Sequence, residues 1–225
     1  MRPRSFLLPA LVAFVLALAP AAAQAAVTLQ PGAYHETPKG ACTLNFVYTD
    51  GTSTYLGTAA HCANGTGDRA TDIEGVEFGT VTWIGDEDDT AWDFAFIKVD
   101  AEDVARVSPA VKGWPTYPKG STVPADTLTG DSIQLSGYGL GYGTTRTTQE
   151  QRTALHAFDD TEIYGVNGPI HWGDSGGPLV HRRTGKALGI VSRLCGGACT
   201  EEGPTVQGIL AKARSRGLSL TLRTV

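Results

Sequence analysis

The chain has 225 residues, a formal net charge of −5 and four cysteines. A mildly acidic protein gains nothing from approaching nucleic acid phosphates, so no nucleic acid partner is expected. The 28 glycines and the many threonines favour turns and strands over helices.

Residues 1–25 have the anatomy of a secretory signal peptide. A short basic start precedes the apolar run Phe6–Ala19, and small residues with a candidate cleavage site follow. A membrane anchor is the alternative, but this run is shorter than the roughly 20 residues that span a bilayer. We predict cleavage after Ala25, with Ala23 as the alternative. The protein is then secreted and extracellular, without stable membrane insertion.

The rest of the chain, 26–225, is predicted to form one all-β domain of two halves. Asp50-Gly51 predicts a hairpin in the first half, and the proline-rich segment Val107–Thr122 connects the halves. A helix is predicted only at Ile209–Arg216, ended by Gly217. The expected strands are Thr43–Tyr48, Thr54–Ala60, Val76–Ile84, Phe94–Val99, Ser132–Tyr138, Leu155–Ile163, Pro178–His181, Ala187–Ser192 and Thr205–Leu210.

Four cysteines in an exported protein predict two disulfides. Three pairings are available, and we favour Cys42–Cys62 with Cys195–Cys199, because the short loop between the last two closes most easily by their own pairing. A metal site is the alternative. It is disfavoured because no histidine or acidic residue stands at a suitable spacing beside either pair.

The stretch Gly173-Asp174-Ser175-Gly176-Gly177-Pro178 carries the clearest chemical signal. A nucleophilic serine needs a sharp turn and backbone N–H groups aimed at the oxyanion that forms during attack. The same Gly-x-Ser-x-Gly pattern occurs in α/β-hydrolases, which place the acid and the histidine after the serine. Here His181 is the only later histidine and no acid separates it from Ser175, so that alternative fails.

Two further motifs stand upstream of this serine. His61 ends an apolar strand in Thr58-Ala59-Ala60-His61-Cys62, and Asp93 begins another in Asp93-Phe94-Ala95-Phe96-Ile97. The order His, Asp, Ser is that of chymotrypsin. With these three motifs the sequence resembles the chymotrypsin/trypsin-like serine protease family, in particular its small secreted bacterial members.

The resemblance implies two antiparallel β-barrels, at about 27–110 and about 120–225, with a short C-terminal helix. It implies that Ser175 attacks a peptide carbonyl, that His61 transfers the proton and that Asp93 orients His61. The N–H groups of Gly173 and Ser175 would form the oxyanion hole. Ser192 matches a family serine that supports the aspartate.

Asp174 has a structural role in this family, in which it pairs with a buried positive group. Pancreatic-type members use a new N-terminus that begins Ile-Val-Gly-Gly, which this chain lacks. A side chain is therefore expected instead, and the candidates are Arg146, Arg152 and Arg193. The mode of activation stays open.

The resemblance also places a substrate pocket beside Ser175. Pro169 stands where trypsin-like members carry an aspartate, so a buried Lys or Arg would lack its counter-charge unless Glu201 or Glu202 reaches in. Leu194 and Thr205 stand where open pockets have glycine. We therefore expect cleavage after small or medium apolar residues. The expected pocket residues are Pro169, His171, Trp172, Ser192, Arg193, Leu194 and Thr205.

These inferences predict a serine endopeptidase that acts on proteins or peptides as a monomer, with no cofactor and no metal. An inactive peptidase-fold binding protein and a secreted esterase are the alternatives. The acidic run Asp86-Glu87-Asp88-Asp89 could bind calcium, but a solvated loop is the favoured reading.

Overall fold

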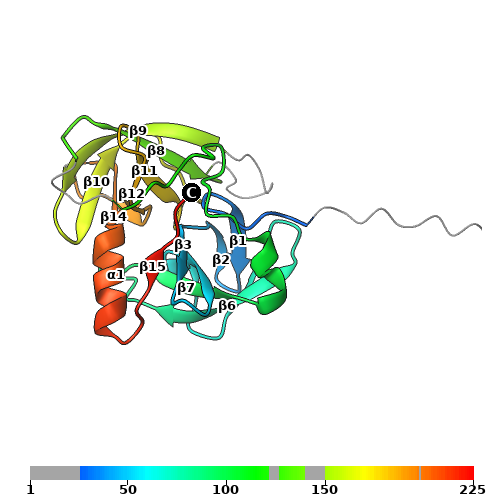
Figure 1. Ribbon diagram of the computed structural model, residues 1–225. Helices are drawn as coiled ribbons and strands as arrows, with labels where there is room; N and C mark the ends of the chain where they lie inside the picture. The colour runs from blue at the N-terminus through cyan, green and yellow to red at the C-terminus, as the bar shows by residue number, and fades with distance from the viewer. Residues whose placement is uncertain (1–25, 122–126, 140–149, 198) are drawn as a thin grey trace, which may run out of the picture.

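The structure is a computed structural model that describes residues 26–121, 127–139, 150–197 and 199–225, without the side chains of 150–152. The predicted signal peptide therefore lies outside the described residues. None of the helices among them is long and apolar enough to cross a membrane. Two antiparallel sheets and one α-helix account for most of the regular structure (Figure 1), which confirms the predicted all-β class with a short C-terminal helix.

The first sheet has eight strands in the order β15-β3-β4-β7-β6-β5-β1-β2. Most come from the first half of the chain, but β15 returns from the C-terminus to pair with β3. The strands are β1 (Tyr34–Thr37), β2 (Gly40–Thr43), β3 (Val47–Thr49), β4 (Thr54–Thr58), β5 (Arg69–Thr71), β6 (Glu77–Ile84), β7 (Ala95–Val99) and β15 (Thr221–Leu222).

The expected strand Thr43–Tyr48 is wrong as a single strand, because the chain leaves the ladder between β2 and β3. In that interval Leu44 N–H donates to Ala33 O at 2.8 Å, and Asn45 N–H donates to Gly57 O at 2.7 Å. The segment therefore contacts the β1 side and the β4 side of the sheet in turn. This bend curls the first sheet round its core.

The second sheet has seven strands in the order β12-β11-β8-β9-β10-β14-β13. An antiparallel bridge between Gly189 and Thr205 brings β12 back to the end of β14, so this sheet also curls on itself. Its strands are β8 (Ser132–Gly137), β9 (Glu150–Asp159), β10 (Ile163–Asn167), β11 (Pro178–His181), β12 (Lys186–Ile190), β13 (Arg193–Leu194) and β14 (Glu201–Pro204).

The expected strand Leu155–Ile163 is also wrong, because it spans a turn between β9 and β10. Asp160 Oδ1 accepts hydrogen bonds from the N–H groups of Glu162 at 2.7 Å and Ile163 at 2.8 Å. An aspartate that bonds the backbone two and three residues on reverses the chain locally.

The helix α1 (Val206–Ser215) replaces the expected strand Thr205–Leu210 and starts three residues before the predicted helix. Thr205 is its N-cap, since its Oγ1 accepts the Gly208 N–H at 3.0 Å. The predicted end is confirmed: Gly217 has a φ of +87°, a conformation that favours glycine. A capped threonine start thus overrides the β-branched pattern that predicted a strand.

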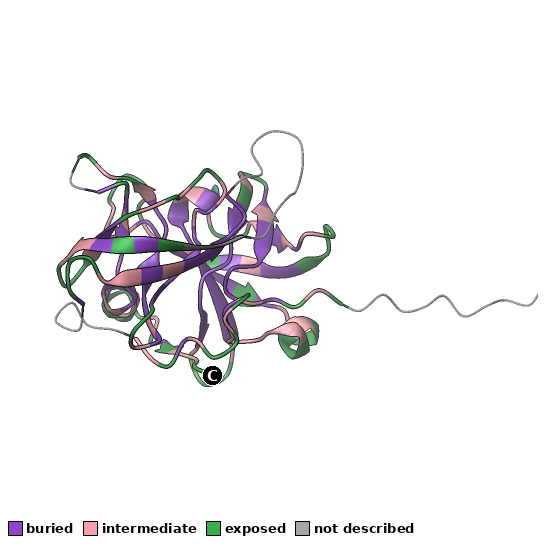
Figure 2. Cartoon of the chain, turned by 90° about the horizontal axis from the view of Figure 1, so that it is seen from above, coloured by how far each residue is buried: buried purple, intermediate pink, exposed green. Residues whose placement is uncertain are grey.

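Three groups of buried side chains hold the fold together (Figure 2). One fills the first sheet around Leu56, another fills the second around Leu179. The third joins the lobes, with Phe94 from the first lobe, Ile190 from the second and Val206 from α1. Both predicted disulfides, Cys42–Cys62 and Cys195–Cys199, are formed.

We predict that Thr205→Ala lowers the free energy of unfolding by about 1 kcal/mol, because α1 loses its N-terminal side-chain acceptor. Urea unfolding at neutral pH, with the disulfides intact, measures the change. Thr66→Ala in an exposed loop is the control and should stay within about 0.5 kcal/mol of the parent. Equal stability of the parent and Thr205→Ala would contradict the assigned cap.

Candidate active site

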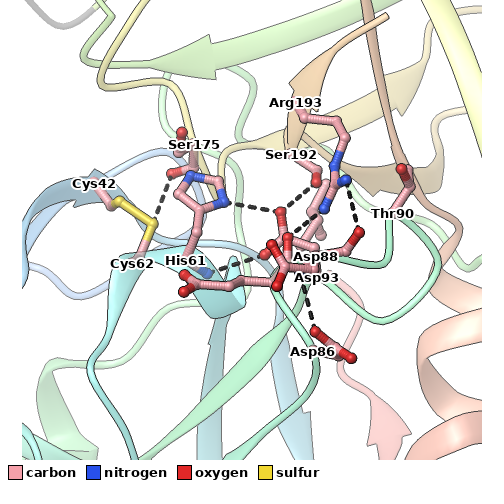
Figure 3. A network of polar contacts seen from close by, with 12 residues as sticks. Cys42, His61, Cys62, Asp86, Asp88, Thr90, Asp93, Ser175, Ser192 and Arg193 are labelled. Carbon is pink, nitrogen blue, oxygen red and sulfur yellow. Dashed lines mark hydrogen bonds and ion pairs between the residues drawn. A yellow bond between two sulfur atoms is a disulfide. The ribbon is translucent and has the colours of Figure 1, made fainter.

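His61 stands directly after β4, in the short 3-10 helix η1 (Ala60–Cys62). The Cys42–Cys62 disulfide ties the next residue to β2. His61 N–H donates to Asp93 Oδ1 at 3.0 Å, and its ring Nδ1 lies 2.8 Å from Asp93 Oδ2 (Figure 3). Backbone and ring are thus both fixed by one carboxylate.

Asp93 is fully buried, two residues before β7, and accepts a third hydrogen bond from the Ser192 hydroxyl. Burial by itself raises the pKa of Asp93, but the hydrogen bonds and charge of His61 and the bond from Ser192 outweigh it, so this pKa lies below its ordinary value. The carboxylate is therefore ionised and can only accept. His61 Nδ1 carries the proton as a consequence, and Nε2 is left as an acceptor.

Ser175 lies in the loop between β10 and β11, and its backbone is anchored to both lobes. Its carbonyl accepts the Thr43 N–H at 2.9 Å, while the next N–H, of Gly176, donates to Val191 O at 2.8 Å. Figure 3 shows Ser175 beside the His61 ring, on the side away from Asp93. Among the described residues its hydroxyl has no hydrogen-bond partner, so a direct bond to His61 is not closed in this structure.

The turn that carries Ser175 requires glycine on both sides. Gly173 has a φ of +99° and Gly176 a φ of +83°. A Cβ at Gly173 would lie 2.8 Å from Tyr138 O, and one at Gly176 would lie 2.4 Å from Thr43 O. Within the described chain, the N–H groups of Gly173 and Ser175 have no hydrogen-bond acceptor. They are thus available as donors to a ligand.

Asp174 is completely buried and points back into the fold. Its Oδ2 accepts the His171 N–H at 2.9 Å, and its carboxylate packs against the backbone of Gly137 and Gly139. Of the three candidate partners, Arg193 is wrong, because its guanidinium donates to main-chain oxygens of the acidic loop. The side chains of Arg146 and Arg152 lie outside the described residues.

A cavity of about 550 Å³ brings His61, Asp93 and Ser175 together. Five of the seven expected pocket residues line it: His171, Trp172, Ser192, Arg193 and Leu194. Trp172 and Leu194 are each 71% exposed, which places them at its mouth.

Two of the expected pocket residues, Thr205 and Pro169, do not line the cavity. Thr205 is buried as the N-cap of α1 and cannot narrow a pocket. Pro169 is exposed outside the cavity.

Three residues of the cavity wall were not expected from the sequence, or were named only as an exception: Glu87, Val191 and Glu201. For Glu201 a signal was present. The short disulfide loop forces the chain to return beside β13, and the resulting register sets Glu201 opposite Leu194. A residue that pairs with a pocket residue across a narrow hairpin is itself a candidate for the pocket.

The residues that could hold a metal are already committed elsewhere. In the described chain, two groups bring three ligand types together, but each contains a cysteine pair that forms a disulfide. In the acidic loop, Asp86 Oδ1 accepts the Asp88 N–H at 3.0 Å and Asp89 Oδ1 accepts the Ala91 N–H at 2.9 Å. Such hydrogen bonds are typical of turns. They fit the interpretation of this acidic run as a solvated loop.

The sequence profile of the trypsin-like peptidase domain matches residues 42–190, well over half of the chain. The chain belongs to the trypsin-like peptidase family. The match contains the histidine, aspartate and serine motifs of the cavity. Membership of this family supports a serine protease, a hydrolase that acts on proteins or peptides.

Solved structures of other proteases show the same fold. Thermobifida fusca protease A has 20% identity and a TM-score of 0.60, over 88% of this chain and 100% of that one. A glutamic acid specific serine protease has 19% identity and a TM-score of 0.58, over 87% of this chain and 100% of that one. An alpha-lytic protease homologue, N4, has 19% identity and a TM-score of 0.53, over 88% of this chain and 100% of that one. The sequence matches none of the curated proteins compared with it.

We predict that Ser192→Ala lowers the free energy of unfolding at pH 7 by about 1.5–3 kcal/mol, because buried Asp93 loses a donor to its charge. The pKa of Asp93 is depressed in the folded state, so this stabilisation is present above the unfolded value of about 3.9 and is lost as the pH falls through the folded pKa. The difference between parent and variant should therefore shrink in acid.

Urea unfolding at pH 7 and at pH 3 measures this dependence. Ser219→Ala, an exposed position, is the control and should change stability by less than about 0.5 kcal/mol at either pH. A Ser192→Ala difference that stays the same at both pH values would contradict the role given to its hydroxyl.

Proposed function

We propose that this protein is a secreted serine endopeptidase that hydrolyses peptide bonds through Ser175, His61 and Asp93 by way of an acyl-enzyme. The observation that carries the proposal is that His61, joined to Asp93 by two hydrogen bonds, lines the same cavity as Ser175. Family membership supports it, because trypsin-like peptidases use these three residue types in this order.

In this mechanism Asp93 keeps the proton on His61 Nδ1, so Nε2 accepts the proton of Ser175 as its oxygen attacks the peptide carbonyl. A rotation of the Ser175 hydroxyl closes the contact that the resting structure leaves open. The negative charge on the carbonyl oxygen is then stabilised by the N–H groups of Gly173 and Ser175. His61 returns the proton to the leaving amine, and water attacks the acyl-enzyme in the same way.

Two opposing features bear on specificity. The preference for small or medium apolar residues stays a prediction, and the apolar walls Ile170, Val191 and Leu194 support it. However, Glu201 lines the cavity. A substrate Lys or Arg was disfavoured only if neither Glu201 nor Glu202 reached the pocket. The glutamic acid specific relative is described as using a histidine triad in substrate binding. Only His61 and His171 line this cavity among the described residues, so we do not propose glutamate specificity.

Secretion and the monomeric state are part of the proposal. The two disulfides support an oxidising compartment, since structural disulfides persist outside the reducing cytosol. Sequencing the N-terminus of the secreted protein tests cleavage after Ala25.

We predict that Ser175→Ala lowers kcat on peptide substrates by at least about 10⁴-fold while the fold is kept, because the attacking oxygen is lost. The parent should also react with a serine-directed phosphonylating reagent at Ser175 and lose activity. Mass spectrometry of the labelled peptide and assays on a mixed peptide library measure both effects.

Ser219→Ala is the matched control, an exposed serine that should keep full activity and leave the label at Ser175. Equal cleavage by the parent and Ser175→Ala would contradict the proposal. Peptide binding without cleavage or labelling would favour an inactive binding protein. Cleavage of esters but of no peptide would favour an esterase.

A further inference from the structure

The inner wall of the cavity carries a second buried carboxyl group, Glu201, that the proposed mechanism does not use. Glu201 lies on β14, opposite Leu194 on β13 and Val166 on β10. It is only 3% exposed, whereas Leu194 is 71% exposed. The two residues line the same cavity, so Glu201 lies at depth and Leu194 lies at the mouth.

The Glu201 carboxyl group has one donor. Its Oε1 accepts the Ser192 N–H at 3.0 Å. In the part of the chain that the structure describes, it makes no other hydrogen bond and no ion pair. A buried carboxylate with a single neutral donor is far from satisfied, since buried charges are ordinarily paired or bonded several times.

The charged groups around Glu201 are mostly acidic. The negative charges of Asp174, Glu202 and Asp93 disfavour a negative charge on Glu201. The cavity wall also carries Glu87. Burial raises the pKa of Glu201 to about 9, the Ser192 N–H opposes this, and the acidic neighbours add to it. On β10, the buried Tyr164 hydroxyl donates to Ile190 O and brings no positive charge.

Three side chains that can carry a positive charge line the cavity, Arg193, His61 and His171, and none of them pairs with Glu201 in the described chain. Arg193 donates to Asp88 O at 3.1 Å and to Glu87 O, at the rim. His61 is bound to Asp93, and His171 lines the cavity from the serine loop. A positive group supplied by a ligand would therefore find an acidic cavity with an unused carboxyl oxygen at its inner end.

We propose that Glu201 determines specificity by receiving the ammonium group of a lysine that precedes the scissile bond. This inference rests on the proposed function, because it assigns the substrate class of the same cavity. The methylene groups of lysine would pack on Ile170, Val191 and Leu194, and the charged end would reach the Glu201 carboxylate.

Lysine fits this site better than arginine. A guanidinium group pairs best when both carboxylate oxygens accept in one plane. Here Oε1 already accepts from Ser192, so one oxygen is fully available. The compact ammonium group needs no more than that. The same walls accept an apolar side chain, which leaves Glu201 protonated and neutral.

The preference for lysine must rise with pH. Glu201, whose pKa burial raises to about 9, is largely protonated at pH 7, and the ammonium group pairs with the ionised form. Binding of lysine therefore releases a proton. The ratio of kcat/KM for lysine over norleucine, its uncharged counterpart, should rise by up to about tenfold per pH unit from pH 7 to pH 9. The ratio cancels the pH dependence of the catalytic residues.

The first test uses peptides that differ only before the scissile bond, with lysine, norleucine, arginine, alanine or glutamate. In the parent enzyme we expect lysine to exceed norleucine by at least about tenfold at pH 9, with the stated fall towards pH 7. Glu201→Gln should abolish the difference between lysine and norleucine and its pH dependence. The matched control Glu202→Gln, on the same strand, should retain the difference and its rise with pH, with the rise moved to somewhat lower pH because one acidic neighbour of Glu201 is lost.

An equal or lower rate for lysine at every pH, or an unchanged ratio in Glu201→Gln, would overturn the inference and leave the proposed function intact. A preference for alanine that is the same in the parent and in both variants would also overturn the inference. It would favour cleavage after small or medium apolar residues.

The second test needs no catalysis. Ser175→Ala protein is titrated with Nα-acetyl-lysine amide by calorimetry at pH 7, in two buffers of different ionisation enthalpy. We expect release of about one proton per bound ligand, and at least tenfold weaker binding without release in the Ser175→Ala/Glu201→Gln protein. Binding of this kind in a protein that cleaves no peptide would sink the proposed function alone. Absence of both binding and release would sink the lysine site.

Discussion

The structure depends on one buried negative charge, the carboxylate of Asp93. It accepts the backbone N–H and the ring Nδ1 of His61 from the first lobe, and the hydroxyl of Ser192 from the second. A buried charge that lacks such partners costs several kcal/mol, so the two lobes are fixed in the relation that supplies these donors. The contacts that make the charge tolerable also aim the imidazole at the cavity.

Glu201 shows what happens when such donors are missing. It lies in the same cavity and receives a single N–H, from Ser192. The two carboxyl groups therefore differ in the direction of their pKa shifts: that of Asp93 falls and that of Glu201 rises. Environments that push the pKa values of two acids apart commonly give them different roles. Asp93 keeps a fixed charge, whereas Glu201 takes up a charge when a cation arrives.

Local chemistry made most of the elements predictable, and its failures have a common cause. Thr205 belongs to a β-branched run, yet its hydroxyl caps α1. The Thr43–Tyr48 run has a strand composition, yet Leu44 and Asn45 turn from one side of the sheet to the other. In each case specific hydrogen bonds outweighed the strand propensity of the run, because propensity is weak beside such contacts.

The sequence by itself determined the all-β class, the two disulfides and the three motifs that meet at the cavity, because each depends on residues close together in the chain. Only the tertiary structure decided which side chains form the cavity wall. It excluded Thr205, brought in Glu201 and joined the C-terminal strand β15 to the first sheet. The physical reason is register: which residues of two strands face each other is set by pairing between distant segments, and a shift of one residue reverses every side chain.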